Sequence, residues 1–239
     1  MADILGKALL DYYQGNYSED LLTETNISEE DELPLPYLFR SYDEMPLLEQ
    51  KALDLAQGRV LDVGCGAGSH SLYLQQKGME VHAIDISKGA VEVATRRGVE
   101  HARTVGVMEL QEGSYDTILL LMNGVGIFQR IDNVANGLKH LAGLLAPGGQ
   151  ILVDSSDLQY MYNRTEEGGI MVPADRYYGE LDFVISYKGI SGEPFPWLYL
   201  DERRFQQICE ANTFGFELVE RGDHFDYLAR ITIGAHSPS

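Results

Sequence analysis

Residues 59–155 constrain the fold most strongly, because they alternate short apolar runs with segments of helical spacing. The apolar runs are VLDV, MEVHAID, ARTVGV, YDTILLLMN and QILVDSS, at residues 60–63, 79–85, 102–107, 115–123 and 150–156. Helical segments lie between them at residues 69–77, 87–97 and 133–145, and each is closely followed by glycine or proline. This order predicts an α/β fold: a Rossmann-like, doubly wound, mostly parallel sheet between two layers of helices.

The two ends of the chain depart from this alternation. Residues 1–50 place apolar side chains at helical spacing and then become acidic and proline-rich, which predicts an N-terminal helical and loop cap. Residues 158–200 contain the alternating run ELDFVISYKG and then EPFPWLYLD, which predict a β-rich insertion or edge sheet. Residues 200–212 predict a helix, and residues 216–222 and 224–234 predict a terminal antiparallel hairpin, because their connection is too short for a parallel crossover. We therefore expect one domain over residues 1–239.

The charge balance limits the partners of the protein. The formal net charge is -19, so binding to nucleic acid or to an anionic membrane, which relies on Lys and Arg, is disfavoured. Residues 1–50 hold twelve acidic residues against Lys7 and Arg40, including the run Glu29 to Glu32. We interpret this run as a solvated acidic face or loop, and attraction of a cationic substrate is the alternative.

The remaining composition predicts a reduced protein without a structural metal. Cys65 and Cys209 are too few for a disulfide framework and fit no zinc-binding pattern. No apolar run approaches the roughly 20 residues that cross a bilayer, and the start MADILGKALLDYY carries charges where a secretory segment is apolar. We expect a cytoplasmic location.

A glycine-rich turn follows the first apolar run of the alternating region. Gly64, Gly66 and Gly68 form G-x-G-x-G, whereas the dinucleotide fingerprint G-x-G-x-x-G needs a third glycine where Ser69 stands. A phosphate-binding P-loop is excluded because no Gly-Lys-Ser/Thr follows. The turn permits a close approach of ligand to backbone but is not evidently built for phosphate.

Two acidic residues narrow the class of ligand that the turn can bind. Asp62 lies two residues before the first glycine, where a carboxylate repels pyrophosphate but accepts hydrogen bonds from an ammonium group or from the turn's backbone N–H groups. The helix that starts near Ala67 offers N–H groups to a carboxylate. Asp85 ends the second apolar run 21 residues after Gly64, where such folds bind ribose hydroxyls. An amino acid joined to a ribonucleoside is S-adenosylmethionine.

These residues lie in segments that resemble a known family. The stretches VLDVGCGAGSHSLYLQQKGMEVHAIDIS, SYDTILLLMNGVGIF and LLAPGGQILVDSSD are similar to class I S-adenosylmethionine-dependent methyltransferases. The resemblance covers residues 55–157 well and the C-terminal pattern, up to Ile233, more loosely. It implies S-adenosyl-L-methionine as cofactor and a methyltransferase activity of the 2.1.1 enzyme class.

The resemblance also assigns cofactor contacts. It places the methionine part along the glycine turn, the ammonium group at Asp62, directly or through water, and the ribose at Asp85. It packs the adenine on Ile86 and implies a backbone contact from Val107 or Met108, while Glu109 stays open because the family's usual Asp is missing there. It places Asn123 near the sulfonium. The full predicted set is Asp62, Gly64, Cys65, Gly66, Gly68, Asp85, Ile86, Val107, Met108 and Asn123.

Several of these residues have a structural alternative. Asp62 could only tie down the turn, Asp85 could be a surface strand end, and Asn123 could only shape the turn before Gly124. Cys65 is expected to offer its backbone rather than act as a nucleophile, because no base is recognisable beside it.

The methyl acceptor is less constrained. The sequence after the fourth run is Asn123-Gly124-Val125-Gly126, not the Asn/Asp-Pro-Pro-aromatic of methylases that act on nucleobase or glutamine amino groups. We expect transfer to an O, N or C nucleophile of a small molecule, with a protein substrate second. No catalytic residue is assigned; the candidate bases are acidic residues and Tyr12, Tyr13, Tyr37 and His224.

Residues 35–53 could close over the cofactor, and Arg40 is expected there either to contact a ligand or to pair with an acidic neighbour. The alternatives to an enzyme of this kind are a non-catalytic S-adenosylmethionine-binding protein and an NAD-dependent oxidoreductase. The oligomeric state is not assigned.

Overall fold

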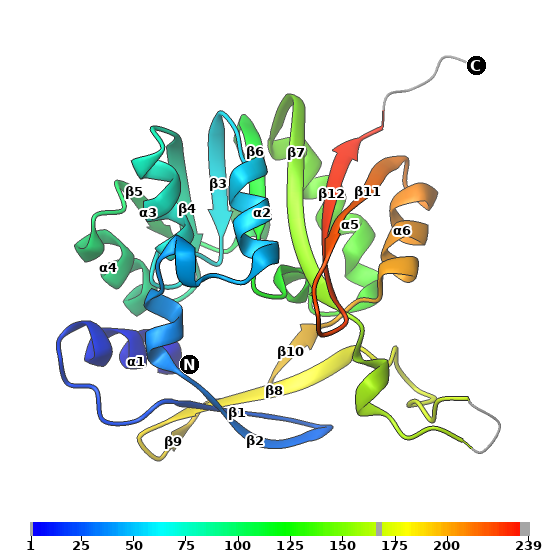
Figure 1. The fold of residues 1–239 in the computed structure, drawn as a ribbon, viewed down its shortest axis with the longest axis horizontal. Coiled ribbons are helices and arrows are strands. Elements are labelled where there is room, and N and C mark those ends of the chain that lie inside the picture. The colour runs from blue at the N-terminus through cyan, green and yellow to red at the C-terminus, as the bar shows by residue number, and fades with distance from the viewer. Residues whose placement is uncertain (1, 166–168, 235–239) are drawn as a thin grey trace.

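A seven-stranded sheet forms the centre of the computed structural model, which describes residues 2–165 and 169–234 (Figure 1). Its strand order is β11-β12-β7-β6-β3-β4-β5. The strands are β3 (Arg59–Val63), β4 (Glu80–Asp85), β5 (His101–Thr104), β6 (Tyr115–Leu120), β7 (Leu145–Ser156), β11 (Phe214–Arg221) and β12 (Asp226–Ile233). The five strands from β3 to β7 pair in parallel, and β12 joins β7 antiparallel, as the sequence predicts.

Helices cover both faces of this main sheet. The helices are α2 (Leu47–Leu55), α3 (Ser69–Gln76), α4 (Lys88–Arg97), α5 (Ile131–Leu144) and α6 (Glu202–Ala211). Apolar side chains of α2 and α3 pack on one face of the sheet against Val60, Leu119 and Leu152. The neighbouring residues Leu61, Ile118 and Ile151 point to the other face, where they join the cluster that includes α5 and α6. The predicted three-layer arrangement is therefore confirmed.

Some boundaries differ from the predicted ones. The third predicted strand ends at Thr104, and β6 ends at Leu120 rather than at Asn123. Met122 and Asn123 take positive φ angles of 64° and 57°, a left-handed conformation that cannot continue a strand. The apolar character of residues 121–123 predicts a strand, but it carries no information about the φ angles that end β6.

A second sheet has the order β10-β8-β1-β2, with β9 added beside β8. Its strands are β1 (Leu21–Thr25), β2 (Ser28–Leu33), β8 (Glu180–Tyr187), β9 (Ile190–Ser191) and β10 (Phe195–Leu198). The acidic run 29–32 lies on strand β2 with its residues exposed, as the predicted solvated face requires, and not in a loop. Residues 158–200 contribute β8, β9 and β10 to this second sheet and none to the edge of the main sheet. The reason is long-range pairing, because β1 finds its partner β8 more than 150 residues later in the chain. Residues 166–168 of the predicted insertion, and residues 1 and 235–239 of the predicted domain, lie outside the described residues.

The second sheet lies below the main sheet in Figure 1 and crosses the carboxyl ends of its parallel strands. Helix α1 (Ile4–Tyr13), which the apolar spacing predicts, connects the two parts: it packs on α4 and also contacts β8. Short 3-10 turns, η1 (Leu35–Phe39) and η2 (Tyr42–Glu44), lead from the second sheet to α2. Within residues 2–165 and 169–234, no helix has the length and apolar character needed to span a membrane.

Candidate active site

The strand order reverses direction between β3 and β6, because the chain runs from β3 outward to β5 and returns on the other side as β6. Open α/β sheets bind ligands at the carboxyl ends of strands beside such a switch point. The glycine turn, residues 64–68, follows β3 there. Gly64, Gly66 and Gly68 have φ angles of 75°, 52° and 83°, which explains why glycine occupies all three positions.

The glycine turn is open on one side. A Cβ added at Gly66 meets nothing within 4 Å, and one added at Gly64 meets only Ile127 Cδ1 at 3.7 Å. At Gly68, by contrast, a Cβ would lie 2.7 Å from Val99 Cγ2, because the start of α3 packs tightly there. Gly64 and Gly66 thus leave room for a ligand, while Gly68 serves packing.

Asp62 and Asp85 lie on either side of this turn. Asp62 is buried, and its Oδ2 accepts a 2.6 Å hydrogen bond from the Ser71 hydroxyl in α3, so it ties the strand to the helix. Asp85 accepts hydrogen bonds from Gly66 N at 2.9 Å and from Ser87 N at 2.8 Å, one on each oxygen. Burial raises the pKa of Asp85 even though these two N–H groups oppose the rise. Each Asp85 oxygen retains capacity to accept a further hydrogen bond.

Apolar side chains are exposed beside Asp85. Ile86 is 81% exposed and Met108 is 50% exposed, and both follow the ends of adjacent strands. A Cβ built on Gly106 would lie 3.7 Å from Ile86 Cγ2, which places the two segments together. Val107 is buried and its carbonyl already accepts from His140, while Glu109 turns back to cap Gly106 N at 3.4 Å. Glu109 thus makes a local contact.

Asn123 shapes a strained turn at the end of β6. Its amide donates to the Leu198 carbonyl at 3.0 Å and accepts from the Ser155 hydroxyl at 3.2 Å. Its backbone carbonyl accepts from Gly126 N. The polar groups of Asn123 are therefore used within the protein, and the geometry favours the turn-shaping alternative over an amide directed at the sulfonium.

Asp154 of β7 holds the same turn and was not predicted from the sequence. Its two oxygens accept from Asn123 N at 3.0 Å and from Gly124 N at 2.9 Å. The residue remains partly exposed to solvent. Desolvation raises the pKa of Asp154 to about 6, against the lowering effect of the two N–H groups. The signal in the sequence was a lone carboxylate within an otherwise apolar strand.

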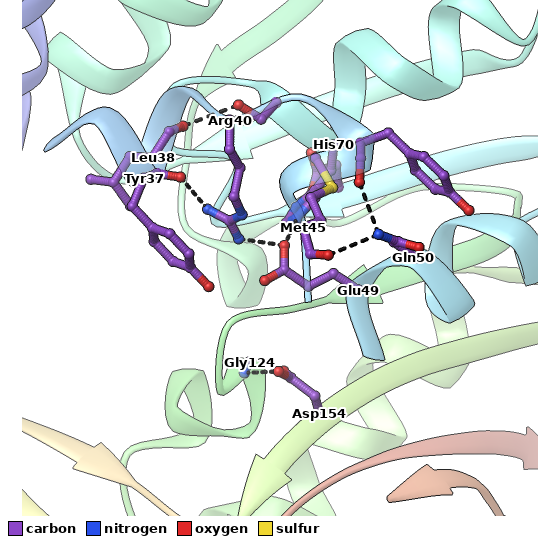
Figure 2. A network of polar contacts seen from close by, with 12 residues as sticks. Tyr37, Leu38, Arg40, Met45, Glu49, Gln50, His70, Gly124 and Asp154 are labelled. Atoms are coloured by element: carbon purple, nitrogen blue, oxygen red, sulfur yellow. Dashed lines mark hydrogen bonds and ion pairs between the residues drawn. The ribbon is translucent and has the colours of Figure 1, made fainter. Parts of the chain in front are cut away.

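A buried triad, Arg40, Glu49 and His70, closes the other side of the site (Figure 2). Both Arg40 Nη2 and His70 Nε2 contact Glu49 Oε2, His70 at 2.6 Å. The contacts join the segment after η1 to α2 and to the first turn of α3. Of the two possibilities for Arg40, the structure therefore shows the ion pair, and the sequence did not identify Glu49 and His70 because their pairing is tertiary.

The triad holds its charges against burial. Burial opposes ionisation of Glu49, but His70 and Arg40 outweigh it, so the pKa of Glu49 lies below its ordinary value. Burial also disfavours the His70 imidazolium, but the hydrogen bond to Glu49 and the charges of Asp62 and Glu49 hold the pKa of His70 above its ordinary value. The charges of Glu49 and His70 also act on Asp154, which lies on the opposite side of the site in Figure 2.

The candidate bases named from the sequence are dispersed. Tyr37 is 37% exposed, and its ring lies under the Arg40 guanidinium at 3.9 Å from the centroid. Tyr37 therefore lies beside the triad (Figure 2). Burial raises the pKa of Tyr37, the positive charge of Arg40 lowers it, and the charges of Glu49 and Asp154 raise it. Tyr12 packs on Phe39, Tyr13 donates to the Arg96 carbonyl, and His224 lies in the segment between β11 and β12, so the structure does not gather these three there.

Cys65 occupies the glycine turn with a buried side chain. Burial raises the pKa of the Cys65 thiol, and the charges of Asp62 and Asp85 raise it further. The thiol therefore stays protonated, which agrees with a backbone role.

Comparisons with known proteins identify similar chains. A family model for a methyltransferase domain matches residues 60–149. A solved S-adenosylmethionine-dependent methyltransferase from Bacteroides fragilis, in complex with S-adenosyl-L-homocysteine, is 44% identical with a TM-score of 0.90, and the alignment covers 98% of this chain and 95% of that one.

Two curated proteins are also similar. A ubiquinone biosynthesis O-methyltransferase from Xanthomonas oryzae is 33% identical over 111 residues, which cover 43% of this chain and 45% of that protein. A demethylmenaquinone methyltransferase from Tropheryma whipplei is 26% identical over 191 residues, which cover 77% of this chain and 74% of that protein. The chain thus spans less than half the length of the ubiquinone relative that it matches.

Proposed function

Because the chain belongs to the S-adenosylmethionine-dependent methyltransferases, we propose that it transfers a methyl group from S-adenosylmethionine to an oxygen, nitrogen or carbon nucleophile of a small-molecule acceptor. S-adenosylmethionine supplies the methyl group on a sulfonium, so the acceptor's electron pair forms the bond to carbon while the carbon–sulfur bond breaks and S-adenosylhomocysteine leaves. The observation that carries the proposal is the meeting of an open glycine turn and the Asp85 carboxylate at one switch point.

The residues present fit the cofactor. The open side of Gly64 and Gly66 accommodates the methionine part, and Asp62 lies in the preceding strand with one oxygen committed to Ser71. Asp85 offers its remaining acceptor capacity to the two ribose hydroxyls. The exposed side chains of Ile86 and Met108 supply apolar surface for adenine. The hydrogen bond between the Val107 carbonyl and His140 of α5 holds the backbone beside Met108 in place.

The methyl group would then lie toward the end of β6. There Asp154 and Asn123 hold the left-handed turn, and the buried triad faces it across the site. Holding a nucleophile in line with the methyl carbon supplies much of the rate of such a displacement, so rigid positioning is the chain's main contribution. An acceptor that must lose its proton passes it to a carboxylate at the site or to water.

Three observations support a small acceptor. The net charge of -19 disfavours nucleic acid, and the two curated relatives carry names that refer to quinones. The second sheet lies across the ends of the parallel strands, where a macromolecular substrate would otherwise enter.

The direct test is incubation of the protein with methyl-labelled S-adenosylmethionine and a metabolite extract, followed by detection of labelled product. We expect a labelled small molecule and formation of S-adenosylhomocysteine. Binding of S-adenosylhomocysteine without any labelled product, from either the extract or added proteins, would favour the non-catalytic binding protein instead.

A further inference from the structure

The second sheet carries four aromatic side chains in a row: Phe183 of β8, Phe195 and Trp197 of β10, and Tyr199 just after it. The ring centroids of Phe183 lie 6.1 Å from Phe195 and 6.2 Å from Tyr199, and those of Phe195 and Trp197 are 6.2 Å apart. All four side chains remain partly exposed. They lie on one face of the sheet, because Phe195 pairs directly with Phe183 and strand residues two apart share a face.

This aromatic row faces the body of the protein. At one end, Trp197 lies against Gly126 after β6, where an added Cβ would be 2.1 Å from the indole. At the other end of the same face, Ile185 and Tyr187 pack into the cluster formed with α1. The middle of the row therefore lies between these two attachments, on the side of the parallel strands' carboxyl ends.

Polar groups lie beside the row at the methyl-transfer end. Tyr199 lies between Leu198, whose carbonyl accepts from the Asn123 amide, and Leu200, whose N–H donates to the hydroxyl of Ser155, the residue after Asp154. Burial raises the pKa of Tyr199 to about 12, and the charges of Tyr160 and Asp154 add to the rise. Glu49 uses only Oε2 in its contacts with Arg40 and His70, so Oε1 is uncommitted among the described residues. Aromatic surface thus adjoins Asp154, and Glu49 lies across the site from Asp154 (Figure 2).

We propose that the aromatic row binds the methyl acceptor and that the acceptor is a planar aromatic compound with a hydroxyl or amino group on its ring. This inference rests on the methyltransferase function proposed above. Partly exposed rings at spacings of about 4.5–7 Å favour stacked and edge-to-face contacts with a further ring. The ring substituent then reaches the turn at Asn123, where its electron pair forms the bond to the methyl carbon as the carbon–sulfur bond breaks and S-adenosylhomocysteine leaves, and its proton passes to Asp154 or water.

If these four side chains served packing alone, we would expect them to be covered. Aromatic side chains that only hold two layers together are covered, as Tyr187 is at 1% exposure on the same face. The four residues of the row keep exposed surface although their face is directed inward. Ligand sites are lined mainly by apolar and aromatic side chains, so this surface suits a binding site.

Trp197 is the chain's one tryptophan and so reports binding at the row directly. The experiment titrates protein saturated with S-adenosylhomocysteine with catechol and with its saturated analogue 1,2-cyclohexanediol, and follows tryptophan fluorescence. A parallel assay measures transfer of labelled methyl to phenols and anilines and to aliphatic alcohols and amines of matched size. We expect catechol, but not the diol, to change the fluorescence, and only ring compounds to be methylated.

The variant Phe183→Leu removes the central ring of the row and leaves Trp197 as the reporter. It should raise the catechol dissociation constant and the acceptor KM about tenfold, with the affinity for S-adenosylhomocysteine unchanged. Phe216→Leu, at a T-shaped pair with Phe205 on the main sheet, is the matched control and should change neither. Phe195→Leu serves as a second variant if Phe183→Leu fails to bind S-adenosylhomocysteine.

Methylation of aliphatic acceptors in preference to ring compounds would overturn the assignment, as would an unchanged acceptor KM in a row variant that binds S-adenosylhomocysteine. Failure of the wild-type protein to bind S-adenosylhomocysteine would contradict the proposed function itself, so the two failures are distinguishable.

Discussion

The carboxylate of Asp3 accepts a 2.8 Å hydrogen bond from the hydroxyl of Ser87. The same carboxylate caps α1 through Gly6 N and accepts from Gly89 N at the start of α4. Ser87 in turn donates its backbone N–H to Asp85. The first helix of the chain is thereby attached to the segment that carries the proposed ribose contact.

Asp3→Ala should lower stability by about 1–2 kcal/mol, because it removes a helix cap and two contacts to α4. It should also weaken S-adenosylhomocysteine binding, since Ser87 and Asp85 lose their support. Denaturation and titration calorimetry measure the two effects. Tyr13→Phe is the control, because it removes an α1–α4 contact at the far end of the helix. Equal affinity in both variants would show that α1 does not support the ribose site.

Glu49→Gln should lower the free energy of unfolding by about 3 kcal/mol, because it leaves Arg40 and His70 buried without their counter-charge. Urea denaturation at neutral pH measures the loss. Glu80→Gln is the control: it breaks the exposed pair with Arg59, whose atoms lie 2.8 Å apart, and should leave the midpoint nearly unchanged. Similar midpoints for the two variants would argue against the triad as a buried unit.

His70 should give stability a distinct pH dependence. Its folded pKa is raised, so its contribution is complete below the unfolded value of about 6.5 and is lost as the pH rises through the folded pKa. The folded pKa of Glu49 is lowered, so its contribution to stability is complete above its unfolded pKa of about 4.3 and is lost as the pH falls through the folded pKa. The stability difference between wild type and His70→Gln should be largest at about pH 5–6 and smaller at about pH 8. A difference that grows with pH would reverse the assigned direction.

Gly68→Ala and Gly78→Ala separate backbone strain from lack of space. Both glycines have a φ angle of 83°, but an added Cβ meets Val99 Cγ2 at 2.7 Å in the first and nothing within 4 Å in the second. Gly78→Ala should cost about 1 kcal/mol for the left-handed conformation, and Gly68→Ala about 1–3 kcal/mol more for overpacking. Thermal denaturation compares them. Equal costs would mean that α3 moves freely away from α4.

The sequence predicted those parts of the site whose cause is local. Gly64, Gly66 and Asp85 lie within one strand-turn-helix-strand unit, and their spacing specifies both the positive φ angles and the strand end. Strand β2 has the acidic sequence SEEDEL, which by itself does not predict a strand. It forms one because it pairs with β1, and β1 in turn pairs with β8, far along the chain.

The buried triad could not be predicted from the sequence, because its contacts also join separate segments of the chain. Glu49 and His70 lie on two different helices and meet only when α2 packs beside α3. Asp154 looked like an ordinary strand residue, because only the folded turn brings Asn123 N and Gly124 N to its carboxylate.

Titration calorimetry of S-adenosylhomocysteine into the wild type and into Asp85→Asn, with NAD as the comparison ligand, tests the central claim most directly. Asparagine preserves the size of the side chain but removes the charge and one acceptor. We predict that the wild type binds S-adenosylhomocysteine and not NAD, and that Asp85→Asn, confirmed as folded by its melting curve, binds about tenfold more weakly or worse. Binding of NAD by the wild type, or unchanged affinity for S-adenosylhomocysteine in Asp85→Asn, would contradict the cofactor site described above.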